Sequence, residues 1–175
     1  MAEFALFDIE NDVLTPTVHC HTLKALSEIM VLYPDCYLEV YKYLYYMCSH
    51  HPKRNPFFDM IEIDKEEAIL AQIDSSGFTS EDDAVQEALA LCKHLWTTPT
   101  SRSYFGFKQM LDNLTSYMTN TEFKDGRDGN ITALVSAGKS FDGLRQSFKG
   151  VFKDLMEEQS STARGNAAIA YDQRS

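Results

Sequence analysis

The stretch from Asn130 to Gln159 constrains the fold of this chain most, because its apolar residues recur at alternating steps of three and four. This spacing places side chains on one stripe of an α-helix. A turn-forming sequence, DGRDG at 125–129, comes just before it, and Asn130 can cap the free N–H groups of the first turn. We therefore predict a long helix over 130–159, with a stripe of Leu134, Ala137, Phe141, Leu144, Phe148, Val151 and Leu155.

Three glycines, Gly138, Gly143 and Gly150, interrupt this predicted helix. Each costs about 1 kcal/mol relative to alanine in a helix interior. A helix with this composition needs support from packing, so we expect another helix or a neighbouring chain close against it. Because the apolar repeat is short and broken by glycines, we interpret it as the core helix of a compact bundle and not as a coiled coil.

Similar apolar spacing and helix-start signals predict further helices earlier in the chain. Proline at 34 and at 99 marks helix boundaries, and Ser80 with Asp83 resembles a capping box. Short connections favour antiparallel neighbours, so the last two long helices should form a hairpin. The predicted helices cover about 22–33, 35–49, 64–73, the stretch from the Ser80 cap to 97, and 99–120.

The two ends of the chain lack long helical patterns. Residues 1–21 contain short apolar pairs and Pro16, which favours a short strand or an extended arm. Residues 160–175 are small and polar without periodicity, which predicts an extended tail that binds a partner. The prediction is thus a mainly α protein: an N-terminal arm (1–21), a compact bundle of about five helices (22–159) and a C-terminal tail (160–175).

The predicted tail carries four candidate partner-binding residues. Ile169 and Tyr171 would enter apolar sites on another chain, and Arg164 and Arg174 would pair with acids. A second candidate surface is the tyrosine-rich segment 37–49, because tyrosine buries a large ring while keeping a polar hydroxyl. There we consider Tyr37, Tyr41 and Tyr45 as partner-binding residues, and we favour the alternative of a broad core helix with partly wet edges.

Composition excludes several classes of protein. No run of about 18 apolar residues predicts a membrane span, and the acidic start MAEFALFDIEND does not resemble a signal or transit peptide. We expect the chain to fold in a cytoplasm, with its four scattered cysteines reduced. Residues 1–100 hold 6 Lys or Arg against 17 Asp or Glu, whereas residues 101–175 hold 10 against 9. No basic cluster suits phosphate neutralisation, which disfavours specific nucleic-acid binding.

No motif predicts catalysis, a cofactor or a metal. Gly138-Lys139-Ser140 resembles the end of a phosphate-binding loop but lacks its first glycine and its preceding strand. His19-Cys20-His21 and Cys48-Ser49-His50-His51 hold zinc-type ligands, yet without the spacing of a zinc site. With no nucleophile, base and orienter in a recognisable set, we expect a protein that is not an enzyme. A small metal-binding protein or a hydrolase is the less favoured alternative.

Four segments resemble a family of small structural proteins from the virions of tailed bacteriophages, particularly crAss-like phages. They are YLEVYKYLYYMCS at 37–49, TTPTSR at 97–102, DGRDGN at 125–130 and ARGNAAIAYDQR at 163–174. The resemblance implies a virion component made in the host bacterial cytoplasm. It implies a head-to-tail connector, or neck ring, that oligomerises around the DNA channel and docks portal or further neck rings through its terminal arms.

In a ring of this kind, the acidic first half of the chain could face the channel and let DNA pass without binding. The competing hypothesis is a phage-encoded protein outside the virion, a scaffold or host-interaction factor that binds one partner.

Overall fold

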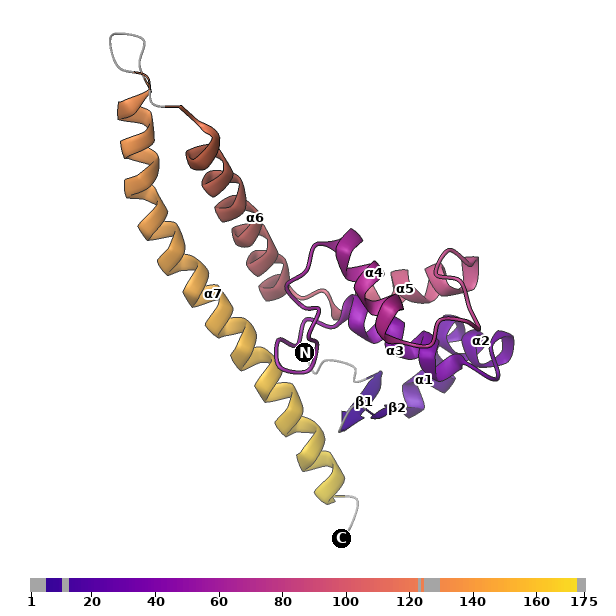
Figure 1. The fold of residues 1–175 in the computed structure, drawn as a ribbon. Coiled ribbons are helices and arrows are strands. Elements are labelled where there is room, and N and C mark those ends of the chain that lie inside the picture. Colours follow the sequence, from indigo (N-terminus) through magenta and orange to yellow (C-terminus); the bar gives the residue numbers. More distant parts are fainter. Residues whose placement is uncertain (1–5, 11–12, 123, 125–129, 173–175) are drawn as a thin grey trace. The chain divides into compact units, whose positions relative to one another are not determined.

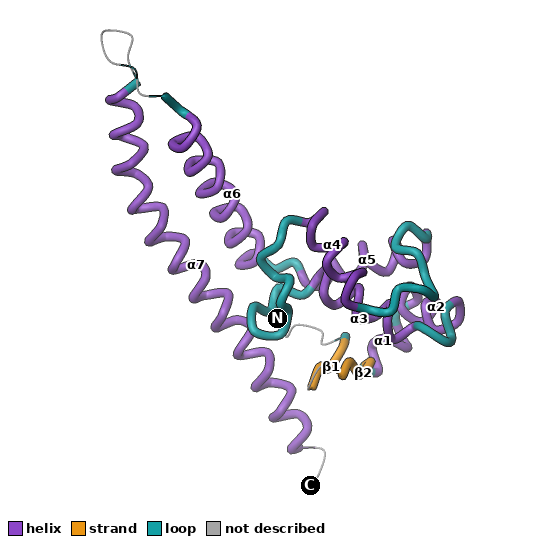
Figure 2. Tube along the Cα trace, in the orientation of Figure 1, coloured by secondary structure: helices purple, strands orange, loops and turns teal. Residues whose placement is uncertain are grey.

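A computed structural model provides the structure, and it describes residues 6–10, 13–122, 124 and 130–172. Of residues 8–10, 62–63 and 160–172 it describes the backbone alone. The chain divides into two compact units, Met1–Thr97 and Thr98–Ser175. Helices dominate both units (Figures 1 and 2), which confirms the predicted mainly helical class. The predicted single bundle over 22–159 does not match this division, because the boundary between the two units, at residues 97 and 98, falls inside that range.

Unit 1 combines a small β-hairpin with short helices. Strands β1 (Phe7–Glu10) and β2 (Val13–Pro16) pair antiparallel, with Phe7 opposite Pro16. The helices that follow are α1 (Val18–Thr22), α2 (Lys24–Leu32), α3 (Tyr37–Cys48), α4 (Glu62–Gln72) and α5 (Asp83–Trp96).

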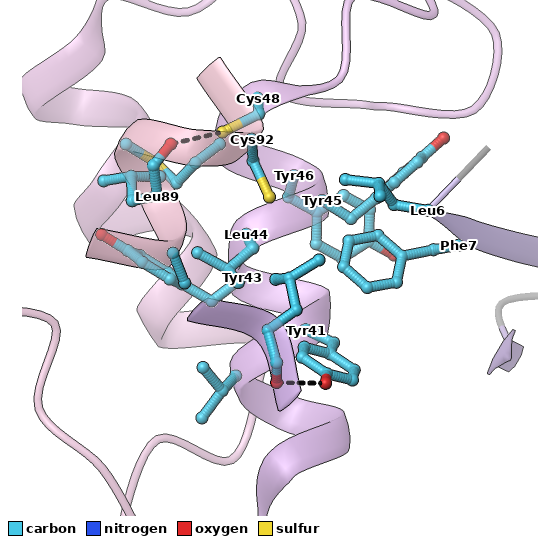
Figure 3. Packing of buried hydrophobic residues seen from close by; sticks show 14 of the residues in the cluster. Leu6, Phe7, Tyr41, Tyr43, Leu44, Tyr45, Tyr46, Cys48, Leu89 and Cys92 are labelled. Carbon is cyan, nitrogen blue, oxygen red and sulfur yellow. Dashed lines mark hydrogen bonds between the residues drawn. The ribbon is translucent and has the colours of Figure 1, made fainter. Parts of the chain in front are cut away.

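Helix α3 is the centre of unit 1, since it contacts α2, α4, α5 and β2. Its apolar and aromatic residues point in every direction, so it is buried nearly all round along its second half. Figure 3 shows this packing around Tyr41, Tyr43 and Leu44, none of which is exposed. Each of the two tyrosines satisfies its hydroxyl, Tyr41 on the Leu26 carbonyl at 2.7 Å and Tyr43 on a Glu66 carboxylate oxygen at 2.9 Å. A buried hydroxyl without a partner would oppose folding.

The described part of the predicted N-terminal arm, residues 6–10 and 13–21, belongs to this core, and residues 1–5 and 11–12 lie outside the described residues. Leu6, Phe7 and Leu14 are buried, and the Phe7 ring lies 5.0 Å from that of Tyr41 and 5.8 Å from that of Trp96. The Leu6 carbonyl accepts hydrogen bonds from the Thr17 amide and from the Cys20 thiol, which fixes the start of α1 against the hairpin. The short strand was therefore predicted correctly, but the arm is not detached from the domain.

Unit 2 is a hairpin of two long helices, α6 (Pro99–Asn120) and α7 (Ile131–Asp172). They run side by side in opposite directions, and α7 continues past the start of α6 (Figure 1). Thr98 caps α6, because its hydroxyl accepts the Ser101 amide while the Ser101 hydroxyl accepts the Thr98 amide. The Thr98 hydroxyl also donates to Glu158 at 3.2 Å, and the Tyr104 ring stacks on Phe148 with 5.1 Å between centroids.

Three local predictions are wrong. The expected extended tail from residue 160 does not begin there, because the backbone stays helical to Asp172. Ser80 does not cap α5, whose N-cap position is Asp82. The Asn130 side chain is directed to the preceding loop, where its oxygen accepts the Lys124 amide and its nitrogen donates to the Glu122 carbonyl.

Candidate functional site

The C-terminus of α3 carries a buried polar cluster that no sequence pattern predicts. The last carbonyl groups of a helix have no partner inside the helix. Here Lys65 donates from its ammonium group to the Met47 carbonyl at 2.8 Å. Asn55 donates to the Tyr46 carbonyl at 2.8 Å and to the Ser49 carbonyl at 2.7 Å, while its own oxygen accepts the Phe57 amide. We call Asn55 and Lys65 the α3 cap.

His50 lies next to the α3 cap and shares its buried surroundings. Burial, and with it the nearby positive charge of Lys65, lowers the pKa of the His50 imidazole to about 4. The ring is therefore neutral at physiological pH. This chemistry suits a structural role better than acid–base catalysis, because a general acid or base needs a pKa near the working pH.

The buried thiols lie in the same core. Cys20 and Cys92 are fully buried and Cys48 almost so. Burial raises the pKa of Cys20 to about 11, and a hydrogen bond with Cys48, together with burial, raises the pKa of Cys92. Thiols with raised pKa values are poor nucleophiles and poor metal ligands, since both roles require the thiolate.

The two segments with zinc-type side chains, 19–21 and 48–51, do not form a metal-binding group in the described part of the structure. Cys20 is held by the Leu6 carbonyl at the hairpin, and Cys48 faces the Leu89 carbonyl at 3.8 Å (Figure 3). Among the residues whose side chains the structure describes, no three His, Cys, Asp or Glu residues lie close enough to hold a metal ion.

The sequence Gly138-Lys139-Ser140 lies within α7. Its backbone is helical, and the Ser140 hydroxyl donates to the Ser136 carbonyl at 3.1 Å. A phosphate-binding loop needs free amides that converge on the ligand, whereas the amides of a helix interior are committed to carbonyls one turn earlier.

The three candidate tyrosines of α3 differ in exposure. Tyr41 is fully buried and Tyr45 is 7% exposed, with its ring 5.9 Å from Trp96. Tyr37 is half-buried at the start of the helix, with its ring 5.8 Å from that of Tyr41. Tyr41 and Tyr45 thus serve the core of unit 1, as the favoured core-helix interpretation expects, and they present no surface to a partner.

The candidate residues of the tail lie at or beyond the end of the description. Arg164, Ile169 and Tyr171 belong to the helical backbone of α7, but their side chains are outside the described part of the structure. Arg174 lies outside the described residues altogether.

Helix α6 has an unusual exposed surface. Met110, Tyr117 and Met118 are 40%, 47% and 37% exposed. Its charged residues are Arg102, Lys108 and Asp112, and none follows Asp112 in the eight residues that end the helix. Interfaces between proteins are depleted of charge and enriched in tyrosine and methionine. This side of the hairpin, which we call the α6 face, therefore has the composition of a contact surface.

A second notable surface lies on unit 1. An open groove between α4 and the start of α5 is lined by Glu66, Glu67, Leu70, Ser80, Glu81 and Gln86. Its carboxylates give it a negative potential, and its shape gives no enclosed space for a small molecule.

The described helices include none with the length and apolar composition that a membrane span requires. Comparison of the chain with known protein families, with curated proteins and with solved structures found no match.

Proposed function

We propose that this protein is a structural assembly component that associates with further copies of itself through the α6 face. The carrying observation is the exposed, nearly uncharged side of α6 with Met110, Tyr117 and Met118. A two-helix hairpin buries one stripe of each helix and leaves the remaining apolar residues in water. Packing α6 against another copy would remove them from water without bringing like charges together.

From the resemblance to structural proteins of tailed phages, we propose that the assembly is part of a virion. The specific position we propose is the neck ring between portal and tail. A ring adaptor needs a rigid repeated unit and surfaces that meet neighbouring copies. Unit 1 fits the first requirement, because no buried side-chain nitrogen or oxygen among its described residues lacks a hydrogen-bond partner. The hairpin fits the second requirement with its α6 face. The end of α7, with Arg164, Ile169 and Tyr171, is the proposed dock for an adjacent ring.

Association through α6 can be measured by mass photometry and sedimentation equilibrium of the purified protein. Met110→Asp with Tyr117→Asp should abolish the oligomer while circular dichroism still reports a folded helical protein. Gln146→Asp and Ser136→Asp together are the matched control, because both sites are exposed, both lie on α7 and the charge change is equal. An oligomer that survives the α6 changes, or a wild-type protein that stays monomeric at high concentration, would refute association through this face.

The virion role is tested by mass spectrometry of purified particles with copy numbers determined. We expect the protein at a fixed multiple per particle, and a chain lacking residues 160–175 should remain folded yet fail to enter particles. A protein abundant in infected cells and absent from particles would instead favour the alternative, a scaffold or host-interaction factor outside the virion.

A further inference from the structure

A row of cations runs along the exposed side of α7. Arg145, Lys149 and Lys153 follow one another at steps of four, which places them on one side of the helix. All three are exposed, and Phe152 beside them keeps 37% of its surface in water. Lys153 pairs with Glu157 at 3.6 Å, whereas Arg145 and Lys149 make no ion pair with the side chains that the structure describes. We call these three residues with Phe152 the α7 row.

The opposite charge is concentrated on α4 and the start of α5. Residues 62–87 hold nine acids and a single lysine, Lys65. That lysine is buried and donates to the Met47 carbonyl, so its ammonium group is withdrawn from the surface. Glu67 and Glu81 are exposed at the groove beside the partly buried Leu70. This surface therefore offers carboxylates around an apolar patch, the counterpart of the cations around Phe152.

We propose that the α7 row of one copy docks on the acidic α4–α5 groove of a second copy. The charge complementarity selects this occupant, because the groove lies in the densest acidic stretch of the chain and the row presents cations without acids between them. The inference rests on the proposed function and specifies how copies would meet. Because the two surfaces differ, the contact is heterologous, and its repetition gives a closed ring or an open filament. A contact between two identical α6 faces alone would give only a dimer.

The strength of the contact should depend on salt. Exposed ion pairs contribute little each because water and salt screen them, and at 0.15 M salt the screening length is about 8 Å. Burial of Phe152 against Leu70 would add an apolar component that salt does not screen. We therefore expect the assembly to weaken, and not to vanish, between low and high salt.

Charge reversal tests the contact in the full-length protein. Arg145→Glu with Lys149→Glu should reduce the apparent association constant at least tenfold by mass photometry at 0.05 M salt. Adding Glu67→Lys with Glu81→Lys to the same chain should restore assembly. The matched control is Lys24→Glu with Lys53→Glu, two exposed lysines of unit 1 that lie outside the groove. Circular dichroism of every variant checks that the helices are retained.

Each outcome is decisive. Assembly that is unchanged by the α7 reversal, or a compensating groove reversal that restores nothing, overturns the docking proposal. If either occurs while the α6 face still controls association, the proposed function stands and this contact alone is wrong. If the wild-type protein does not associate at all, both fail together. A loss of folding in the α7 variant is recognised by circular dichroism, and Lys149→Glu alone, with Glu67→Lys as its partner change, then replaces the double reversal.

Discussion

The ammonium group of Lys65 lies 2.8 Å from the carbonyl oxygen of Met47, with 7% of the Lys65 residue exposed to water. A cation at the C-terminus of a helix interacts favourably with the helix dipole and satisfies a carbonyl that the helix cannot. Helix α4, which carries Lys65, is thereby joined to the end of α3. Asn55 completes the arrangement from the loop between these two helices.

Replacing Lys65 by methionine should lower the free energy of unfolding by about 1–3 kcal/mol, because the Met47 carbonyl loses its charged donor in a buried place. Methionine keeps most of the aliphatic volume, so the measured loss reports the hydrogen bond and charge. Urea unfolding followed by circular dichroism gives the value. Lys24→Met, at an exposed position, should stay within about 0.5 kcal/mol of wild type. Equal effects at both positions would contradict the α3 cap.

Acidification should destabilise unit 1 through His50. The pKa of His50 is about 4 in the folded protein and about 6.5 in the unfolded chain. Between these values the unfolded chain binds more protons, so the free energy of unfolding is highest above pH 6.5 and falls as the pH drops towards 4. The full loss amounts to about 3 kcal/mol. Urea unfolding at a series of pH values measures it.

The variant His50→Gln isolates this contribution, because it should flatten the pH dependence between 4 and 6.5. His94→Gln, at an exposed position of α5, should leave the wild-type slope in place. Direct titration of the His50 ring by NMR should give a pKa well below 6.5, and Lys65→Met should move it upward since a neighbouring cation is removed. A His50 pKa at or above 6.5 would show that the ring is not buried as described.

Asn55→Asp should destabilise the fold more than its small size change suggests. The asparagine nitrogen donates to two carbonyls, and an aspartate oxygen in its place would face both of them without a proton to share. We expect a loss of about 2–4 kcal/mol, because two carbonyls lose their donor and a charge is buried. Thermal unfolding provides the measurement, and Asn113→Asp on exposed α6 is the control. A near-neutral Asn55→Asp would mean that Lys65 compensates for the new charge.

Tyr41→Phe tests the assignment of Tyr41 to the core. The ring volume is unchanged, so the loss of about 1 kcal/mol reflects the hydroxyl that donates to the Leu26 carbonyl. Tyr117→Phe, on the exposed α6 face, should leave stability unchanged. Both are read from urea denaturation midpoints. Since burial raises the pKa of Tyr41, absorbance titration should also show a phenol that does not ionise until the protein unfolds.

Alanine at Gly138, Gly143 and Gly150 together should stabilise α7. A Cβ atom added at any of them meets nothing within 4 Å, so the substitutions cause no clash in the described structure. Each should contribute about 1 kcal/mol from helix propensity. Thermal melting followed by helical circular dichroism is the readout. A lower melting temperature on substitution would reveal a close neighbour along this side of α7 in solution.

The long helices could be predicted from the sequence because their signals are local. The Pro99 start of α6 and the stripe of α7 depend on neighbouring residues alone, and both were placed within a residue or two. The C-terminal end of α7 was not predicted, because residues 160–172 lack a periodic pattern of apolar residues. Pattern analysis detects a helix only by such a period. The division into two units was missed for a related reason. The boundary at Thr97 has no loop rich in glycine or serine, and its one compositional sign is the change from an acidic first part to a balanced second part, which was not interpreted from the sequence as a domain boundary.

The polar interior of unit 1 could not be predicted because its partners are distant in the sequence. From the sequence alone, Asn55 is expected to be a loop residue between two prolines, and Lys65 is expected to be an exposed cation among acidic residues. Their function becomes visible where the chain returns to the end of α3, 18 positions away in the case of Lys65. The tyrosines of α3 could not be assigned from the sequence because their amphipathic chemistry suits both cores and interfaces. In the structure, Tyr41 packs against Phe7 and Tyr45 against Trp96, which assigns both to the core.

The order of the units along the chain also orders their folding during synthesis. Every described residue of the unit 1 core lies before Thr97, so this core can close as soon as the first unit has left the ribosome. Thr98, by contrast, pairs with Glu158, which is translated 60 residues later. The hairpin of α6 and α7 therefore completes its fold after unit 1 has formed.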